Sequence, residues 1–167
     1  MMKVFATVAA MLVVTGCAAT QVGSKHTVTV KWQRLVDERG QTCQRCGTTQ
    51  DKVRQGAQLL RRCLRPLNMQ VVLEETPLDP ETVARDVSES NRIFLDGRPL
   101  EDWLHAKEGR SLCGSCCDQL GTRVECRTTV VDGRAYEAIP AVFIVRAGLL
   151  AADAALAADA PPQTCCP

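Results

Sequence analysis

Thr27-Val28-Thr29-Val30-Lys31-Trp32-Gln33-Arg34-Leu35-Val36, followed after a short loop by Cys43-Gln44-Arg45-Cys46, is the stretch that decides the fold. Apolar side chains alternate with polar ones in its first half, which predicts a strand at 27–36. The Cys-x-x-Cys then leads into residues 48–65, where apolar side chains recur at helical spacing until a proline ends the pattern. The sequence therefore predicts a strand, a dithiol and a helix in direct succession.

The remaining chain continues this alternation of strands and helices. Strands are predicted at 69–73, 92–95, 124–131 and 135–138, and helices at 80–87 and from 140 to about 157. Residues 98–121 show no period and are expected to form an irregular, cysteine-rich insertion before the fourth strand, 124–131. This order predicts an α/β fold, with a small mixed central sheet flanked by helices.

The N-terminus carries an export signal. Lys3 precedes a short apolar run at 4–14, and small residues then lead to Cys17. Val14-Thr15-Gly16-Cys17 resembles a bacterial lipoprotein lipobox. The resemblance implies that residues 1–16 are removed, that Cys17 is lipidated, and that 17–26 tether the protein to a membrane. It also implies an extracytoplasmic location, on the periplasmic face of the outer membrane, since no acidic residue follows the cysteine.

Composition narrows the classes of function. The length allows one domain, predicted at 27–157, with a disordered tail at 158–167 that contains Cys165 and Cys166. A net charge of +1 and the lack of a basic block argue against nucleic acid as a partner. No catalytic Ser-His-Asp set, phosphate loop or dinucleotide fingerprint is present. Ten cysteines outside the cytosol instead indicate disulfides, redox chemistry or soft-metal binding.

Cys43 and Cys46 are the candidate catalytic residues. The start of a helix favours a thiolate, and Arg45 adds a positive charge nearby. Strand, Cys-x-x-Cys, helix and strand together resemble the thioredoxin fold. By that resemblance Cys43 attacks a disulfide of a partner protein and Cys46 resolves the mixed disulfide. A structural disulfide or half of a metal site remains the alternative.

A second segment extends the thioredoxin resemblance and departs from it at one position. Residues 90–97 look like the segment in which thioredoxin-like proteins enter a strand through a cis-proline. Asn91 stands at the position of that proline. The resemblance implies that the dithiol is more open without the proline. Metal capture then becomes easier than in a general oxidoreductase.

Four further cysteines form a candidate metal site. Cys113, Cys116 and Cys117 lie in one short segment with Gly114 and Ser115, and Cys126 follows. Clustered thiolates suit soft ions such as Cu(I), Zn, Hg or arsenicals, and the first two have the spacing of a metal knuckle. They could join Cys43 and Cys46 if the fold brings the segments together; disulfides that fix the insertion are the alternative. Cys63, late in the first helix, is expected to be a buried thiol.

The run from 27 to 150 resembles an uncharacterised, cysteine-rich bacterial family of unknown function, number 2703, with a thioredoxin-like architecture. The resembling segments are Trp32, Cys43-x-x-Cys46, Val72–Thr76, Ser90–Leu104, Cys113-x-x-Cys116-Cys117 and Tyr136–Pro140. Three hypotheses follow: a membrane-anchored protein that exchanges thiols and disulfides, a soft-metal-binding protein, or a structural lipoprotein stapled by disulfides. The first needs a protein thiol or disulfide partner and no cofactor, and the second needs a metal ion.

Overall fold

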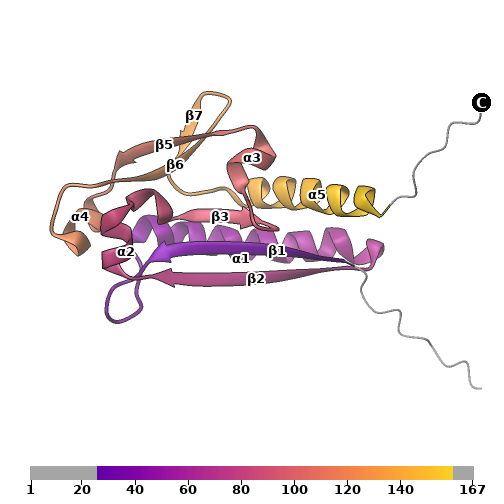
Figure 1. Cartoon of the computed structure of the whole chain (residues 1–167), viewed down its shortest axis with the longest axis horizontal. Coiled ribbons are helices and arrows are strands. Elements are labelled where there is room, and N and C mark those ends of the chain that lie inside the picture. The colour runs from indigo at the N-terminus through magenta and orange to yellow at the C-terminus, as the bar shows by residue number, and fades with distance from the viewer. Residues whose placement is uncertain (1–25, 160–167) are drawn as a thin grey trace, which may run out of the picture.

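A computed structural model describes residues 26–159, which form a four-stranded mixed sheet with helices packed against it (Figure 1). The order is β2-β1-β3-β4, with β1 (His26–Leu35) parallel to β2 (Met69–Leu78) and antiparallel to β3 (Arg92–Leu95). The edge strand β4 (Arg98–Pro99) pairs with β3. The predicted mixed α/β fold is confirmed, and the topology is compatible with a thioredoxin-like fold. β2 is longer than predicted because all of β1 pairs with it.

Two long helices cover the central sheet. α1 (Gln44–Leu64) lies along β1 and β2, and α5 (Ala141–Ala158) lies along β1 and β3. They approach closely, because a Cβ added to Gly56 would lie 2.6 Å from the Cβ of Ile144. By length and composition alone, α5 is apolar enough to cross a membrane. In this fold its buried residues pack on α1, which is what a core helix also does.

Short elements connect the sheet strands. A 3-10 turn at Arg65–Leu67 ends α1. α2 (Pro80–Arg85) begins after Asp79, whose carboxylate accepts a hydrogen bond from the Thr82 amide at 2.7 Å. This helix ends two residues before the predicted 87, and a 3-10 turn at Val87–Glu89 follows.

The cysteine-rich segment is folded, so the expectation of an irregular insertion at 98–121 is wrong. After β4 it forms α3 (Leu100–Leu104), β5 (Lys107–Leu112) and α4 (Gly114–Leu120). β5 lacks an apolar period because it is an edge strand that is largely exposed. Backbone pairing with its neighbour, and not a hydrophobic face, holds it in place.

The strand predicted at 124–131, expected to be the fourth of the central sheet, belongs to a second sheet. β6 (Glu125–Val131) pairs with β5 and with β7 (Arg134–Tyr136), all antiparallel. The cysteine-rich segment does precede this strand, as predicted, but the fourth strand of the central sheet is β4. Through β6 the second sheet contacts the 3-10 turn at Val87–Glu89, and Figure 1 shows α4 at the same end of the molecule as α2.

A buried ion pair fixes the second sheet to the rest of the molecule. The Arg127 side chain on β6 is 4% exposed and lies 3.0 Å from the carboxylate of Glu101 on α3. It also pairs with Glu108, and Thr129 donates a 2.7 Å hydrogen bond to Glu101. Loss of one partner would leave a buried charge uncompensated, which makes this contact an anchor for the sheet.

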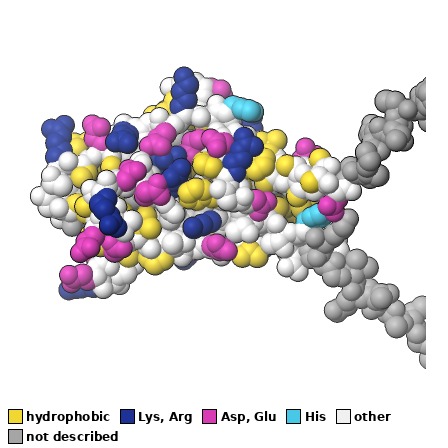
Figure 2. Space-filling model, in the orientation of Figure 1, with side chains coloured by type: hydrophobic (Ala, Val, Ile, Leu, Met, Phe, Trp, Pro, Cys, Tyr) yellow, Lys and Arg dark blue, Asp and Glu magenta, His cyan; other side chains and the backbone are white. Residues whose placement is uncertain are grey.

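Cysteines belong to the hydrophobic core. It extends from β1, β3, α1 and α5 to a group of five cysteines that are each at most 5% exposed: Cys43, Cys46, Cys113, Cys116 and Cys126. The surface differs, since acidic, basic and apolar side chains are interspersed over the face in Figure 2. The chemistry that the sequence predicted therefore lies inside the protein.

Candidate functional site

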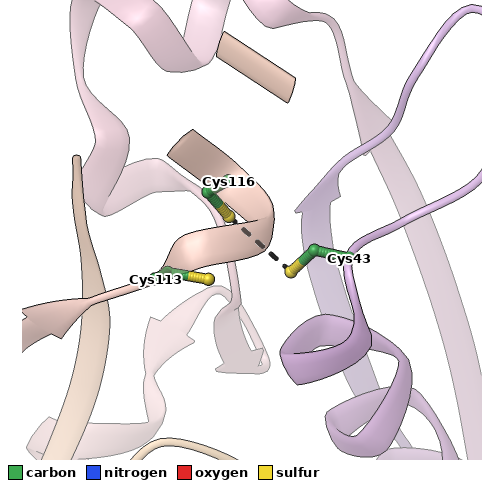
Figure 3. A group of neighbouring side chains, drawn as sticks. All are labelled: Cys43, Cys113 and Cys116. Carbon is green, nitrogen blue, oxygen red and sulfur yellow. Dashed lines mark hydrogen bonds between the residues drawn. The ribbon is translucent and has the colours of Figure 1, made fainter. Parts of the chain in front are cut away.

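Three sulfur atoms meet where the central sheet and the second sheet join. The Sγ atoms of Cys43, Cys113 and Cys116 all lie within 4.8 Å of one another, and all three side chains are buried. Cys43 comes from the start of α1, and the other two come from the start of α4 (Figure 3). The Cys43 and Cys116 sulfurs are 3.6 Å apart.

Cys43 is the N-cap residue of α1. Its sulfur accepts a hydrogen bond from the backbone amide of Cys46 at 3.5 Å, which is an amide that the helix itself leaves unpaired. Hydrogen bonds from the Cys116 and Cys46 thiols hold the pKa of Cys43 far below its ordinary value of 9.0, against the effect of burial. These contacts favour the thiolate form of Cys43.

The pKa of Cys46 shifts in the opposite direction to that of Cys43. Its hydrogen bond to Cys43 and its burial raise the pKa of Cys46 well above the ordinary value. The Cys46 sulfur lies 3.9 Å from the hydroxyl oxygen of Ser90, immediately before β3. The start of the segment at 90–97, which resembles thioredoxin-like proteins, thus lies beside the dithiol.

Asn91 occupies the position where the resemblance expected a cis-proline. Its backbone φ is +61°, in the left-handed region where asparagine is tolerated. Its side chain accepts a hydrogen bond from the Trp32 indole at 3.3 Å and donates one to the Glu137 carbonyl at 3.2 Å. Both contacts are internal, so Asn91 ties β3 to β1 and to the segment after β7.

The other half of the group is built around α4. Cys113 is its N-cap residue, and the Cys113 carbonyl accepts hydrogen bonds from the amides of Cys116 and Cys117 at 3.1 and 3.0 Å. Burial raises the pKa of Cys113. Hydrogen bonds to Cys126 and Cys43 raise the pKa of Cys116.

Cys126 and Cys117 differ in their relation to this group. Cys126, on β6, is hydrogen-bonded to Cys116, which lowers the Cys126 pKa to about 7; Arg45 contributes to the same shift. Cys117 instead accepts a 3.3 Å hydrogen bond from the Val124 amide and contacts that residue's carbonyl. The structure therefore brings Cys126 to the edge of the site and leaves Cys117 outside it.

Arg45 joins the two halves of the site. Its guanidinium donates to the carbonyls of Leu112 at 2.9 Å and Ser111 at 3.4 Å, and it pairs with the Glu137 carboxylate at 3.1 Å. Ser111 also donates to Glu137 at 2.8 Å. We refer to these four residues as the Arg45 clasp. Sequence patterns gave no sign of it, because the partners lie on segments far apart in the chain.

Several cysteines lie elsewhere. Cys63 is exposed, contrary to expectation, because it lies off the helix face that Leu60 and Leu64 bury. All seven cysteines within 26–159 are free thiols, so this part of the chain gives the stapled-lipoprotein hypothesis no disulfide. Cys17, Cys165 and Cys166 lie outside the described residues, as do the predicted signal peptide and most of the tether and tail.

The separation of the sulfurs fits a soft ion. In a tetrahedral zinc site with Zn–S bonds of about 2.3 Å, neighbouring sulfurs lie about 3.8 Å apart. The 3.6 Å between Cys43 and Cys116 is close to that edge, and the 4.8 Å limit requires only a small contraction. A surface pocket of about 320 Å³, lined by Arg45, Cys113 and Glu137 among others, reaches the site from outside.

Comparison with known proteins identifies the family. The model for Domain of unknown function (DUF2703) matches residues 28–148. An uncharacterized protein of Archaeoglobus fulgidus is 38% identical over 117 residues, which cover 70% of this chain and 82% of the relative. That relative is archaeal, so the expected restriction to bacteria is not supported. No solved structure matches the chain. The chain belongs to the DUF2703 family.

Proposed function

We propose that the protein binds one soft metal ion through Cys43, Cys113 and Cys116. The observation that carries this proposal is the convergence of three buried sulfurs within 4.8 Å. They come from two segments far apart in the chain, and each is at most 5% exposed. Thiolates prefer soft ions, which makes Zn, Cu(I), Hg and arsenicals the ions to consider.

Two further thiols stand next to these ligands. Cys126 is hydrogen-bonded to Cys116, and Cys46 to Cys43. Cys117 lies in the same turn of α4 but is bonded to the backbone of Val124. It is therefore a matched control for a ligand.

The test is titration of the reduced, full-length protein with Cd²⁺, followed by the ultraviolet band of the metal–thiolate bond. We expect one ion per chain, with a dissociation constant in the micromolar range or below. Cys113→Ser should weaken this binding strongly, whereas Cys117→Ser should leave it unchanged. Equal affinity in both variants would refute the proposed site.

Thiol–disulfide exchange is the second candidate, and the opposite pKa shifts of Cys43 and Cys46 favour it. The Cys43 thiolate would attack a partner's disulfide, forming a mixed disulfide and releasing one partner thiolate. Cys46, once deprotonated, would attack the Cys43 sulfur and release the second. The pair is thereby oxidised and the partner reduced.

Burial weighs against exchange as the main activity. Cys43 is 5% exposed and Cys46 is 1% exposed, so a protein disulfide reaches neither in this conformation. Reduction of a model disulfide by the full-length protein tests the point. Exchange predicts that Cys43→Ser abolishes the rate; an unaffected rate would exclude this activity.

The thioredoxin-like relationship and the membrane anchor belong to the same proposal. The sheet order β2-β1-β3-β4, with a Cys-x-x-Cys at the start of the helix after β1, supports the first. The lipobox at residues 14–17 supports lipidation and a periplasmic position at the outer membrane. Fatty-acid labelling of the wild-type protein and of Cys17→Ala tests the anchor, since only the wild type should incorporate label.

A further inference from the structure

We propose that the ion this site selects is a trivalent metalloid, As(III) or Sb(III), bound by Cys43, Cys113 and Cys116 as three thiolates. This inference rests on the proposed function and specifies its ligand class. Three observations carry it: the number of converging sulfurs, their burial, and the pairing of the nearby Arg45 guanidinium with Glu137.

Charge discriminates between the candidate ions. Three thiolates bring three negative charges, which a trivalent ion neutralises completely. A divalent ion in the same three-sulfur site leaves one negative charge, and Cu(I) leaves two. A fourth thiolate would add one more negative charge to each of these complexes. Because transfer of a net charge from water to a protein interior is costly, the neutral complex is favoured here.

The surroundings compensate a negative complex only in part. The three cysteines are 5%, 4% and 1% exposed and lie in the hydrophobic core. Arg45 is the cation that acts on the cluster, through Cys126. Its guanidinium is already paired with the Glu137 carboxylate at 3.1 Å. Beyond this paired guanidinium, the described surroundings offer the partial positive charges of two helix N-termini, where Cys43 and Cys113 are the N-cap residues, and no unpaired cationic side chain.

The donor set also favours a three-coordinate ion. Among the described residues, the group of side chains close enough to share an ion contains only sulfur donors, without a histidine or carboxylate. The nearby Cys46 sulfur is engaged with Ser90 at 3.9 Å. A trivalent metalloid forms three bonds to sulfur and keeps a lone pair on its open side, so the three cysteines complete its coordination.

The binding step balances without an oxidant or reductant. Arsenous acid, As(OH)₃, is neutral at physiological pH and can enter through the pocket beside Cys113. Each cysteine sulfur forms one As–S bond as one As–OH bond breaks. The hydroxide that leaves takes up the thiol proton, or a proton from solvent where the cysteine is already a thiolate, and departs as water. Three thiols give As(SR)₃ and three water molecules, and arsenic remains trivalent.

The experiment uses the reduced full-length chain with serine at the cysteines outside the cluster: Cys17, Cys63, Cys117, Cys165 and Cys166. Native mass spectrometry with sodium arsenite should show one arsenic per chain and the loss of three hydrogens. Arsenic X-ray absorption on the wild type should show three sulfur neighbours and no oxygen. Addition of Cys43→Ser, with folding checked by circular dichroism, should abolish the three-sulfur complex.

Competition with Cd²⁺ separates this inference from the proposed function. We expect equimolar arsenite to displace bound Cd²⁺. If Cd²⁺ binds and arsenite does not, or arsenite keeps an oxygen neighbour, the choice of a trivalent ion is overturned and the soft-metal site stands. If neither ion binds, both are overturned. Arsenite binding that survives Cys43→Ser with three sulfurs also overturns the inference.

Discussion

Replacement of Arg45 by glutamine should loosen the site without touching a sulfur. The Arg45 clasp links α1, which carries Cys43, to the end of β5, just before Cys113. Glutamine is too short to reach both backbone carbonyls and lacks the charge that pairs with Glu137. The two halves of the thiol group would then be joined by fewer contacts.

The magnitude follows from the three contacts that are lost. The ion pair contributes about 0–1 kcal/mol, because the Glu137 side chain is 57% exposed and solvent screens it. The 2.9 Å hydrogen bond to Leu112 comes from a charged donor, and such bonds contribute about 1.5–3 kcal/mol. Because the hydrogen bond to Leu112 is exposed to solvent, its contribution lies at the lower end of this range. The 3.4 Å hydrogen bond to Ser111 adds little. The variant should lose roughly 2 kcal/mol in unfolding free energy.

Metal affinity should fall with stability, because ion binding must restore the arrangement that the clasp no longer holds. Roughly 2 kcal/mol corresponds to about a 30-fold rise in the Cd²⁺ dissociation constant. Urea denaturation of the ion-free protein measures the unfolding free energy, and Cd²⁺ titration measures the dissociation constant. Arg54→Gln is the control, since Arg54 on the same helix pairs with Glu75 at 2.6 Å, is 52% exposed and contacts no residue of the clasp through that ion pair. An Arg45→Gln protein with wild-type stability and Cd²⁺ affinity would refute the role of the clasp.

Three further outcomes are expected. Cys116→Ser should weaken Cd²⁺ binding at least about 100-fold, since about 10–16 kcal/mol for a structural zinc site, divided among three ligands, averages at least about 3 kcal/mol per ligand; Cys117→Ser should not, and equal losses in titrations would contradict the assignment. Gly148→Ala should cost about 1–3 kcal/mol in urea denaturation, because its Cβ overlaps Leu60 between α1 and α5; an unchanged midpoint would show that the helices separate easily. Unfolding free energy of the reduced, ion-free protein should rise between about pH 7 and 9.0, because the folded-state pKa of Cys126 is lowered to about 7 and the unfolded state holds the extra proton. Above pH 9.0 it should fall, because the pKa of Cys116 is raised and the folded state now holds more protons; denaturation curves across this range that stay flat would contradict both shifts.

Periodicity sufficed for the elements that bury one face. β1 alternates buried and exposed side chains, and α1 places Val53, Ala57 and Leu60 in the core, so both were predictable from spacing. β5 was not, because its residues Lys107–Leu112 remain largely exposed. The two-residue strand β4 was not predictable either, since it has no pattern of its own and exists through pairing with β3.

The candidate site was half predictable. Residue chemistry alone named the five buried cysteines, and the Cys-x-x-Cys spacing placed Cys43 at the start of a helix. Which of Cys116 and Cys117 faces the cluster depends on the start and rotation of α4, which the sequence did not reveal. Neither did it reveal the contact between Arg45 and Glu137, because long-range pairing of charged side chains leaves no local signature.

One structural fact bears on both candidate functions, and in opposite directions. The second sheet and α4 lie against the start of α1, where an exchange enzyme needs its attacking cysteine exposed to a protein partner. That contact buries Cys43 to 5% exposure and at the same time brings the Cys116 sulfur within 3.6 Å of it. The segment that obstructs a large substrate is therefore the segment that supplies the additional sulfurs. The surface pocket of about 320 Å³ borders the site at Cys113 and is of a size that admits a small ion or a neutral hydroxide. The size of what can reach Cys43, and not its pKa, separates the two functions: thiolate character serves both, but only metal binding uses Cys113 and Cys116 directly.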